Sequence, residues 1–146
     1  MSGLLMSSVL FTTGIRYVRW SANGSTANAS THFNELQVLA GAVNRATSGT
    51  ASIVSGASEG GSASIINNGN IGDYIGFSPG GATVQIDLGS AYADITSLKF
   101  WNYYADGRTY YSVSLSVSSD GVTFRTVFGP QSQASNASGI SVAVTS

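Results

Sequence analysis

The sequence contains no cysteine, which excludes disulfide bonds, thiolate chemistry and cysteine-ligated zinc sites. Charged residues are also scarce, at 9% of 146 positions, and the formal net charge is −1. The six basic residues are scattered, so they do not form the cationic patch that nucleic-acid binding requires. Serine, threonine, asparagine and glycine are abundant instead. We therefore expect a surface made soluble by hydroxyl and amide groups, with no nucleic-acid partner.

The sequence also lacks an apolar run long enough to span a membrane, so we expect no membrane insertion. Residues 1–13 (MSGLLMSSVLFTT) are partly apolar, but they lack the basic segment that opens a secretory signal. We interpret them as an N-terminal arm that is ordered or binds a partner. The length favours a single domain, which we place at residues 14–146.

Catalytic motifs are missing as well. His32 is the only histidine, and no neighbouring motif supplies the partners that a nucleophile–base arrangement needs. Ser58 lies in a G-x-S-x-G sequence (residues 56–60), but this segment is expected to be a loop and not the strand-to-helix turn of a nucleophile elbow. Four aspartates fall at or near expected strand ends and turns, where aspartate commonly bonds to the backbone; they are Asp87, Asp94, Asp106 and Asp120. We therefore predict that the protein is not an enzyme.

The sequence does contain a clear alternation of apolar and polar residues between positions 84 and 128, which is typical of half-buried strands. An Asp-Gly pair at residues 120–121 lies between two alternating runs and indicates a hairpin. Residues 15–20 and 33–39 also alternate, with Leu36 and Val38 as the expected core pair of the second run. Residues 56–64, 71–80 and 131–139 are expected to be loops. The pattern predicts an all-β fold built on antiparallel strands.

Several short motifs occur in an order that resembles a known family. They are residues 86–89 (IDLG), residues 95–101 (ITSLKFW) and residues 118–124 (SSDGVTF). Together they resemble the discoidin family, the coagulation factor 5/8 type C domains, which implies a jelly-roll β-sandwich of the galactose-binding-like class. Residues 16–19 (RYVR) and 35–38 (ELQV) resemble strands that end the domain in that family, yet here they come first. The chain therefore resembles a circularly permuted member, a rearrangement that domains with neighbouring termini tolerate.

Residues 103–110 (YYADGRTY) are similar to a sub-type of this family found in bacterial surface proteins and phage virion proteins. The resemblance implies a phage virion component, such as a capsid decoration protein, a head-fibre module or a tail-fibre module. Such a protein would be made in the host cytoplasm, displayed on the virion surface, docked on other virion proteins and self-associated. The alternative is a free extracellular carbohydrate-binding module.

The family resemblance also implies a place for a ligand, on loops at one end of the sandwich. Aromatic rings there can cover the apolar side of a sugar, while polar side chains bind its hydroxyls. The candidate ligand-binding residues are Trp20, His32, Phe33, Tyr74, Tyr103, Tyr104, Arg108 and Tyr110. Each of them can instead have a structural role, and Arg108 can pair with Asp106 or stack on Tyr104. Trp101 is expected in the core.

A calcium site is a further implication of the resemblance. The family commonly holds structural calcium between an Asp-Gly-Asn turn and the glutamate of the ELQV strand. The matching residues are Glu35, Asn68 and Asn70, with Asp73 close by. Asn68 replaces the aspartate, which removes one negative charge from a site for a hard cation. Two alternatives remain open: a weak calcium site, or a metal-free hydrogen bond from the turn to Glu35.

Overall fold

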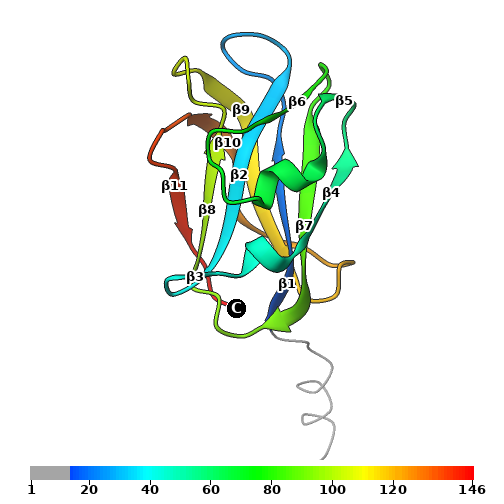
Figure 1. Ribbon diagram of the computed structural model, residues 1–146, viewed down its shortest axis with the longest axis vertical. Coiled ribbons are helices and arrows are strands. Elements are labelled where there is room, and N and C mark those ends of the chain that lie inside the picture. Colours follow the sequence, from blue (N-terminus) through cyan, green and yellow to red (C-terminus); the bar gives the residue numbers. More distant parts are fainter. Residues whose placement is uncertain (1–13) are drawn as a thin grey trace, which may run out of the picture.

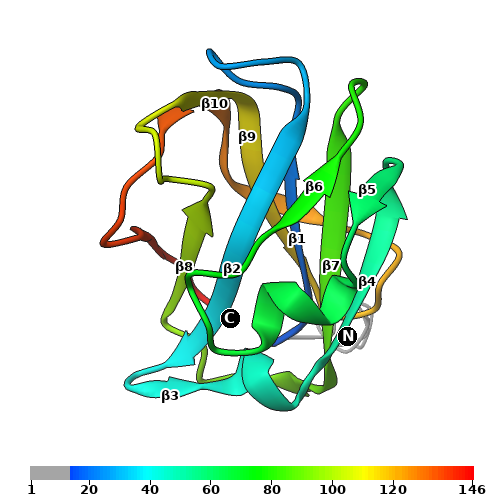
Figure 2. The same cartoon turned by 45° about the horizontal axis from the view of Figure 1, so that its top comes forward.

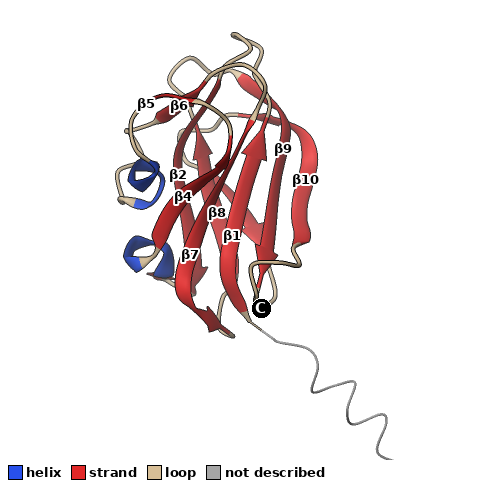
Figure 3. Ribbon diagram, turned by 90° about the vertical axis from the view of Figure 1, so that its right-hand side faces the viewer, coloured by secondary structure: helices blue, strands red, loops and turns tan. Residues whose placement is uncertain are grey.

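The computed structural model describes residues 14–146, which form two packed antiparallel sheets (Figures 1 and 3). The order across the first sheet is β10 (Arg125–Ala134), β9 (Thr109–Ser118), β1 (Ile15–Ala22), β7 (Ala82–Tyr92) and β4 (Thr50–Ser55). The order across the second is β11 (Ile140–Ala143), β8 (Ser97–Asn102), β2 (Thr31–Ala40), β6 (Ile75–Phe77) and β5 (Ser58–Gly60), and β3 (Val43–Asn44) pairs with β2. The predicted all-β fold is confirmed, and the arrangement is consistent with a jelly-roll β-sandwich.

Strand β1 is the centre of the first sheet, and its alternation explains why. Val18 and Trp20 are fully buried, whereas Tyr17 and Arg19 on the opposite face are only partly covered. The strand pairs with β7 on one side and β9 on the other, so Val18 lies opposite both Ile86 and Val117. A central strand buried on one face and solvated on the other needs this two-residue period.

The space between the sheets is filled by side chains from both inner faces. Leu36 and Val38 of β2 are fully buried, as their alternation predicts. The rings of Trp20 and Phe33 meet across the core with 4.1 Å between their centroids. Trp101 is buried as well, but outside this core cluster, and its indole N–H donates to the carbonyl of Ala137. The core is therefore one continuous apolar layer between two sheets.

The predicted hairpin joins β9 to β10, which pair antiparallel. Its turn spans residues 119–124 and is held by Asp120, whose Oδ1 accepts hydrogen bonds from the backbone N–H groups of Val122 and Thr123, both at 2.9 Å.

The three segments predicted to be loops are partly strand or helix. Residues 56–64 include β5 and the start of the helix η2 (Ala63–Asn67), and residues 71–80 include β6. The third segment, residues 131–139, begins with the last part of β10, which continues to Ala134. These segments are short or irregular in register, so no alternation marks them in the sequence.

Two short 3-10 helices lie beside β2 and also reach the first sheet. η1 (Arg45–Ser48) contacts β2 and β7, and η2 contacts β2 and β4. Each contributes one buried residue to the core, Ala46 and Ile66 respectively. The Asn67 amide at the end of η2 donates to the carbonyls of Ala46 and Gly49 at 2.8 and 3.1 Å. These two hydrogen bonds join η2 to η1 and to the residue that follows η1. The loop that follows η2 therefore lies in a fixed position over β2.

Every basic side chain is engaged within the molecule. Arg16 and Arg45 form paired hydrogen bonds with Asp87 and Asp94, respectively. The other contacts are Arg19 over the Phe124 ring, Lys99 over the Trp101 ring, Arg108 with Asp106, and Arg125 with the Thr145 carbonyl. Three of the six cations are therefore neutralised by carboxylates, and the other three are spread over separate parts of the chain.

Both ends of the described chain lie at one end of the sandwich, opposite the loops of residues 23–30 and 103–108 (Figure 1). Ile15 pairs with Tyr92, and the Ser146 hydroxyl donates to the Ile95 carbonyl. The predicted arm, residues 1–13, lies outside the described residues. Among residues 14–146 there is no helix with the length and apolar character needed to cross a membrane.

Candidate functional site

A pocket of about 380 Å³ opens on the outer face of the second sheet, near the end that carries the longer loops. Its lining comes from three neighbouring strands and the loops beside them (Figure 2). We call it the His32 pocket, and it is lined by His32, Glu59, Gly60, Gly61, Tyr74 and Gly76.

The strand pattern places His32 at this surface. Its neighbours Thr31 and Phe33 point into the core, so the imidazole projects from the opposite face of β2. Gly76 of β6 is the direct pairing partner of His32. A Cβ atom at Gly76 would lie 2.7 Å from the Cδ2 atom of the imidazole, so only glycine allows the ring to rest against β6.

Three aromatic rings cluster at the rim of the pocket. Tyr74 and Tyr103 lie 4.7 Å apart between centroids, and the His32 ring lies 5.4 Å from Tyr74 and 5.8 Å from Tyr103. All three pairs meet edge to face, an arrangement favoured by aromatic quadrupoles. Tyr74 retains 47% of its surface exposed. The cluster therefore presents the Tyr74 ring to solvent, and the His32 and Tyr103 rings pack against it.

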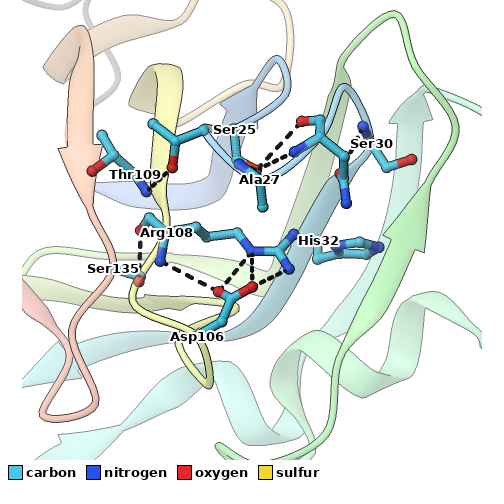
Figure 4. Close-up of polar contacts among 10 residues, drawn as sticks. Ser25, Ala27, Ser30, His32, Asp106, Arg108, Thr109 and Ser135 are labelled. Carbon is cyan, nitrogen blue, oxygen red and sulfur yellow. Dashed lines mark hydrogen bonds and ion pairs between the residues drawn. The ribbon is translucent and has the colours of Figure 1, made fainter.

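Arg108 supports the cluster from the loop between β8 and β9. Its guanidinium lies between Asp106 and His32 (Figure 4), with contacts of 2.9 and 2.6 Å to the two carboxylate oxygens of Asp106. It also lies over the Tyr103 ring, 4.9 Å from the centroid. The bidentate hydrogen bond lowers the pKa of the Asp106 carboxyl and raises the pKa of Arg108. Both groups are therefore charged at neutral pH, and Asp106 neutralises the arginine.

The contact with Arg108 also determines which nitrogen of His32 carries the proton. Nη1 of Arg108 lies 3.2 Å from Nδ1 of His32, and because a guanidinium can only donate, we assign Nδ1 as the acceptor. Burial, and secondly the charge of Arg108, lowers the pKa of His32, so the imidazole is neutral at pH 7. Its proton then lies on Nε2, which faces the pocket.

Across the pocket, Nε2 of His32 faces Oε1 of Glu59 at 3.9 Å. This distance is too long for a direct hydrogen bond. A hydroxyl group in the pocket, to one side of the line that joins the two atoms, could accept from Nε2–H and donate to the carboxylate. The pocket therefore combines an exposed tyrosine ring with an adjacent donor–acceptor pair.

The structure brings together four of the eight residues predicted to bind a ligand: His32, Tyr74, Tyr103 and Arg108. The prediction was wrong for Trp20, Phe33 and Tyr110, which are fully buried in the core and offer no surface to a ligand. Each lies on the inward-facing side of its strand, and apolar burial outweighs any role in binding. Burial also raises the pKa of the Tyr110 phenol to about 12.

Tyr104 lies outside the pocket lining. Its hydroxyl donates to the Ile71 carbonyl at 3.2 Å and so connects the loop after β8 to the loop that covers β2. The predicted pairing of Arg108 with Asp106 is confirmed, whereas the ring beneath the guanidinium is Tyr103 rather than Tyr104.

Glu59 and Gly76 were not singled out from the sequence. Glu59 lies in a serine- and glycine-rich segment, and it is the only charged residue between positions 46 and 72, which was the available signal. Gly76 belongs to a three-residue strand without alternation. Their relation to His32 depends on the pairing of β5 and β6 with β2, which local sequence does not indicate.

The second predicted site lies further along β2, beneath the loop of residues 68–73. Glu35 is fully buried, and its Oε2 accepts a hydrogen bond from the Gly69 N–H at 2.8 Å. Burial raises the pKa of Glu35 to about 7, and nearby Asp73 acts in the same direction, whereas the Gly69 bond opposes them. The predicted hydrogen bond between Glu35 and this turn is therefore present.

The oxygen atoms around this turn are compatible with a hard cation such as calcium. Glu35 Oε1 and Asn34 Oδ1 are buried without a hydrogen-bonding partner in the described part of the chain. Asn68 and Asn70, however, use their side-chain oxygens to accept backbone N–H groups within the turn. Within residues 14–146 there is no group of three or more acidic or histidine side chains placed to hold a metal. Glu35 and Asp73 would be the charged ligands of any calcium ion bound here.

Comparison of the chain with protein-family models, with curated proteins and with solved structures found no match in any of the three. The resemblance to the discoidin family therefore stays a prediction.

Proposed function

We propose that this protein is a non-enzymatic binding module that recognises a neutral saccharide in the His32 pocket. The observation that carries the proposal is the combination of an exposed Tyr74 ring with the 3.9 Å gap between His32 Nε2 and Glu59 Oε1. A sugar ring has an apolar C–H face that packs on an aromatic ring, and hydroxyls at its edge that both donate and accept. The pocket offers a partner for each of these features.

The charges around the pocket favour a neutral ligand over an acidic one. Arg108 is neutralised by its paired bonds to Asp106, so it has little positive charge to offer an anion. Glu59 is half exposed and, among residues 14–146, has no basic partner other than the neutral His32. A carboxylated or sulfated sugar would meet the negative charge of Glu59 without a compensating cation.

Truncation of Tyr74 tests the proposal. We expect Tyr74→Ala to weaken saccharide binding about tenfold or more, because the apolar face of the sugar loses its platform. Stability should change by less than about 1 kcal/mol, since the side chain is largely at the surface. Binding would be measured on an array of neutral and acidic glycans, with the affinity for the best ligand then determined by calorimetry.

Val122→Ala is the matched control, because Val122 is 83% exposed and lies in the turn after β9, at the opposite end of the sandwich. This variant should bind like the wild type. Silence of the wild-type protein across the array would contradict the proposal, as would unchanged affinity of Tyr74→Ala. A preference for acidic glycans would contradict the argument from charge.

A second candidate function is a structural role on a phage particle, as a decoration or fibre component, and this role does not exclude saccharide binding. The feature that favours self-association is β4, which lies at the edge of its sheet and carries no charged residue or proline. Ile53 and Val54 on this strand are 37% and 44% exposed. Open edges without such protection pair readily with another strand.

A lysine on β4 tests this second function. We expect the wild type to associate as its concentration rises, and Val54→Lys to shift it toward the monomer, because a charged edge opposes strand pairing. Light scattering coupled to size-exclusion chromatography would measure the molar mass. A wild type that stays monomeric at every concentration would argue against assembly through β4.

A further inference from the structure

A second hollow lies at the loop of residues 23–30 and shares no lining residue with the His32 pocket. It has a volume of about 330 Å³, and Tyr111 of β9 stands at its edge. A neighbouring hollow of about 240 Å³ adjoins it, and the two share Asn23 and Gly80. Together they form a continuous surface that we call the Tyr111 groove.

An irregularity in β9 creates this surface. Tyr110 and Val113 are buried, but the two residues between them are both exposed, which breaks the alternation of the strand. Ser112 has a φ of 55°, the only positive value among the described residues other than glycine. A serine in this conformation costs free energy, and bulges of this kind commonly re-aim a side chain at a functional site.

The bulge holds Tyr111 in a fixed position at the surface. The Tyr111 carbonyl accepts from the Asn23 N–H at 2.9 Å, and the Tyr111 N–H donates to the Gly24 carbonyl at 3.1 Å. The side chain nevertheless remains 43% exposed. Backbone bonds on both sides therefore fix the residue, while its ring stays open to solvent.

The polar side chains beside the Tyr111 ring are available to hydrogen-bond a ligand. Within residues 14–146, the Asn23 amide, the Ser112 hydroxyl and the Tyr111 hydroxyl have no hydrogen-bonding partner. None of the residues lining the groove is charged. A ligand for this surface must therefore present an apolar face and several neutral donors and acceptors.

We infer that the Tyr111 groove is a second saccharide-binding site, specific for neutral sugars and separate from the His32 pocket. Tyr111 would carry the C–H face of the sugar, while Asn23 and Ser112 would bond its hydroxyls. The inference rests on these residues alone and holds whether or not the His32 pocket binds a ligand. A polysaccharide that reached both sites would bind with higher avidity than either site alone provides.

Nuclear magnetic resonance of the full ¹⁵N-labelled chain can test the two sites separately. The probes are glucose, galactose, mannose, rhamnose, N-acetylglucosamine and N-acetylgalactosamine, each titrated alone. We expect at least one of them to shift the amide signals of Asn23, Tyr111 and Ser112 in a saturable manner. Single neutral sugars should bind in the millimolar range, which corresponds to about −4 kcal/mol.

Tyr111→Ala should raise the dissociation constant at this groove about tenfold or more, whereas Tyr111→Phe should retain binding because the ring remains. The dispersion of the spectrum reports whether each variant is folded. Tyr74→Ala is the reciprocal control and should leave the shifts at Asn23 and Ser112 unchanged. The inference is overturned if no sugar in the panel moves these signals, or if the shifts persist in a folded Tyr111→Ala variant.

Discussion

Replacing Trp20 by alanine is expected to remove about 3–5 kcal/mol from the free energy of unfolding. Trp20 is fully buried on the central strand of the first sheet, and its ring lies 4.1 Å from that of Phe33. The substitution leaves a cavity between the sheets that the surrounding strands cannot close. Because small domains are stable by only about 5–15 kcal/mol, a loss of this size would leave the variant partly unfolded under mild conditions.

Urea denaturation followed by circular dichroism would measure this change. Tyr74→Ala removes another aromatic side chain, but from a half-exposed position, and should shift the midpoint only slightly. The comparison separates core residues from site residues among those predicted to bind a ligand. A Trp20→Ala variant that kept its stability but lost saccharide binding would contradict the structural role assigned to Trp20.

The second large effect concerns pH. The pKa of Glu35 is about 7 in the folded protein against 4.5 in the unfolded chain, so the folded state holds its proton more tightly. This stabilisation is fully present below pH 4.5 and is lost as the pH rises through 7. The expected loss of stability between pH 4.5 and pH 8 is about 3 kcal/mol.

Glu35→Gln isolates this contribution, because glutamine does not ionise and its carbonyl can still accept from Gly69. The lowered pKa of His32 acts in the opposite direction, because the folded state binds that proton less tightly, and it is present in both proteins. We therefore expect stability to fall with pH more steeply in the wild type than in Glu35→Gln, as measured by urea denaturation in EDTA. Parallel pH profiles would show that the Glu35 proton is not held as proposed.

Repeating the measurement with calcium at pH 8 distinguishes the two alternatives for this site. If the ion binds between Glu35 and Asp73, calcium should raise the Tm of the wild type and not that of Glu35→Gln. If calcium has no effect on the wild type, Glu35 serves the fold through its bond to Gly69 alone.

The strands that could be predicted from the sequence are those with one buried and one solvated face. β1 and β7 show this alternation, as does β9 from Val113 to Val117, and their core residues follow from it. β5 and β6 are three residues long and carry glycines, so their pairing is visible only once the chain has folded. Local pattern is a strong guide for long amphipathic strands and a weak one for short strands at an edge.

The ligand-binding residues could be predicted only in part, because an aromatic side chain is equally suited to a core and to a sugar. Trp20 and Tyr74 both lie next to expected turns or loops, yet one faces the other sheet and the other faces solvent. Which face a residue takes depends on strand register near the loops, where bulges occur. The irregular pairing of β9 with β10, for example, accompanies a Tyr111 that is exposed beside a buried Tyr110.

The shared location of Ile15 and Ser146, at the end of the sandwich away from both hollows, has a practical consequence for attachment. A linker or affinity tag joined after Ser146 would leave from the far side of the domain. Immobilising the protein on a sensor chip through this tag would therefore direct Tyr74 and Tyr111 toward the solution. The same geometry would allow the domain to be fused to a carrier particle with both surfaces outermost.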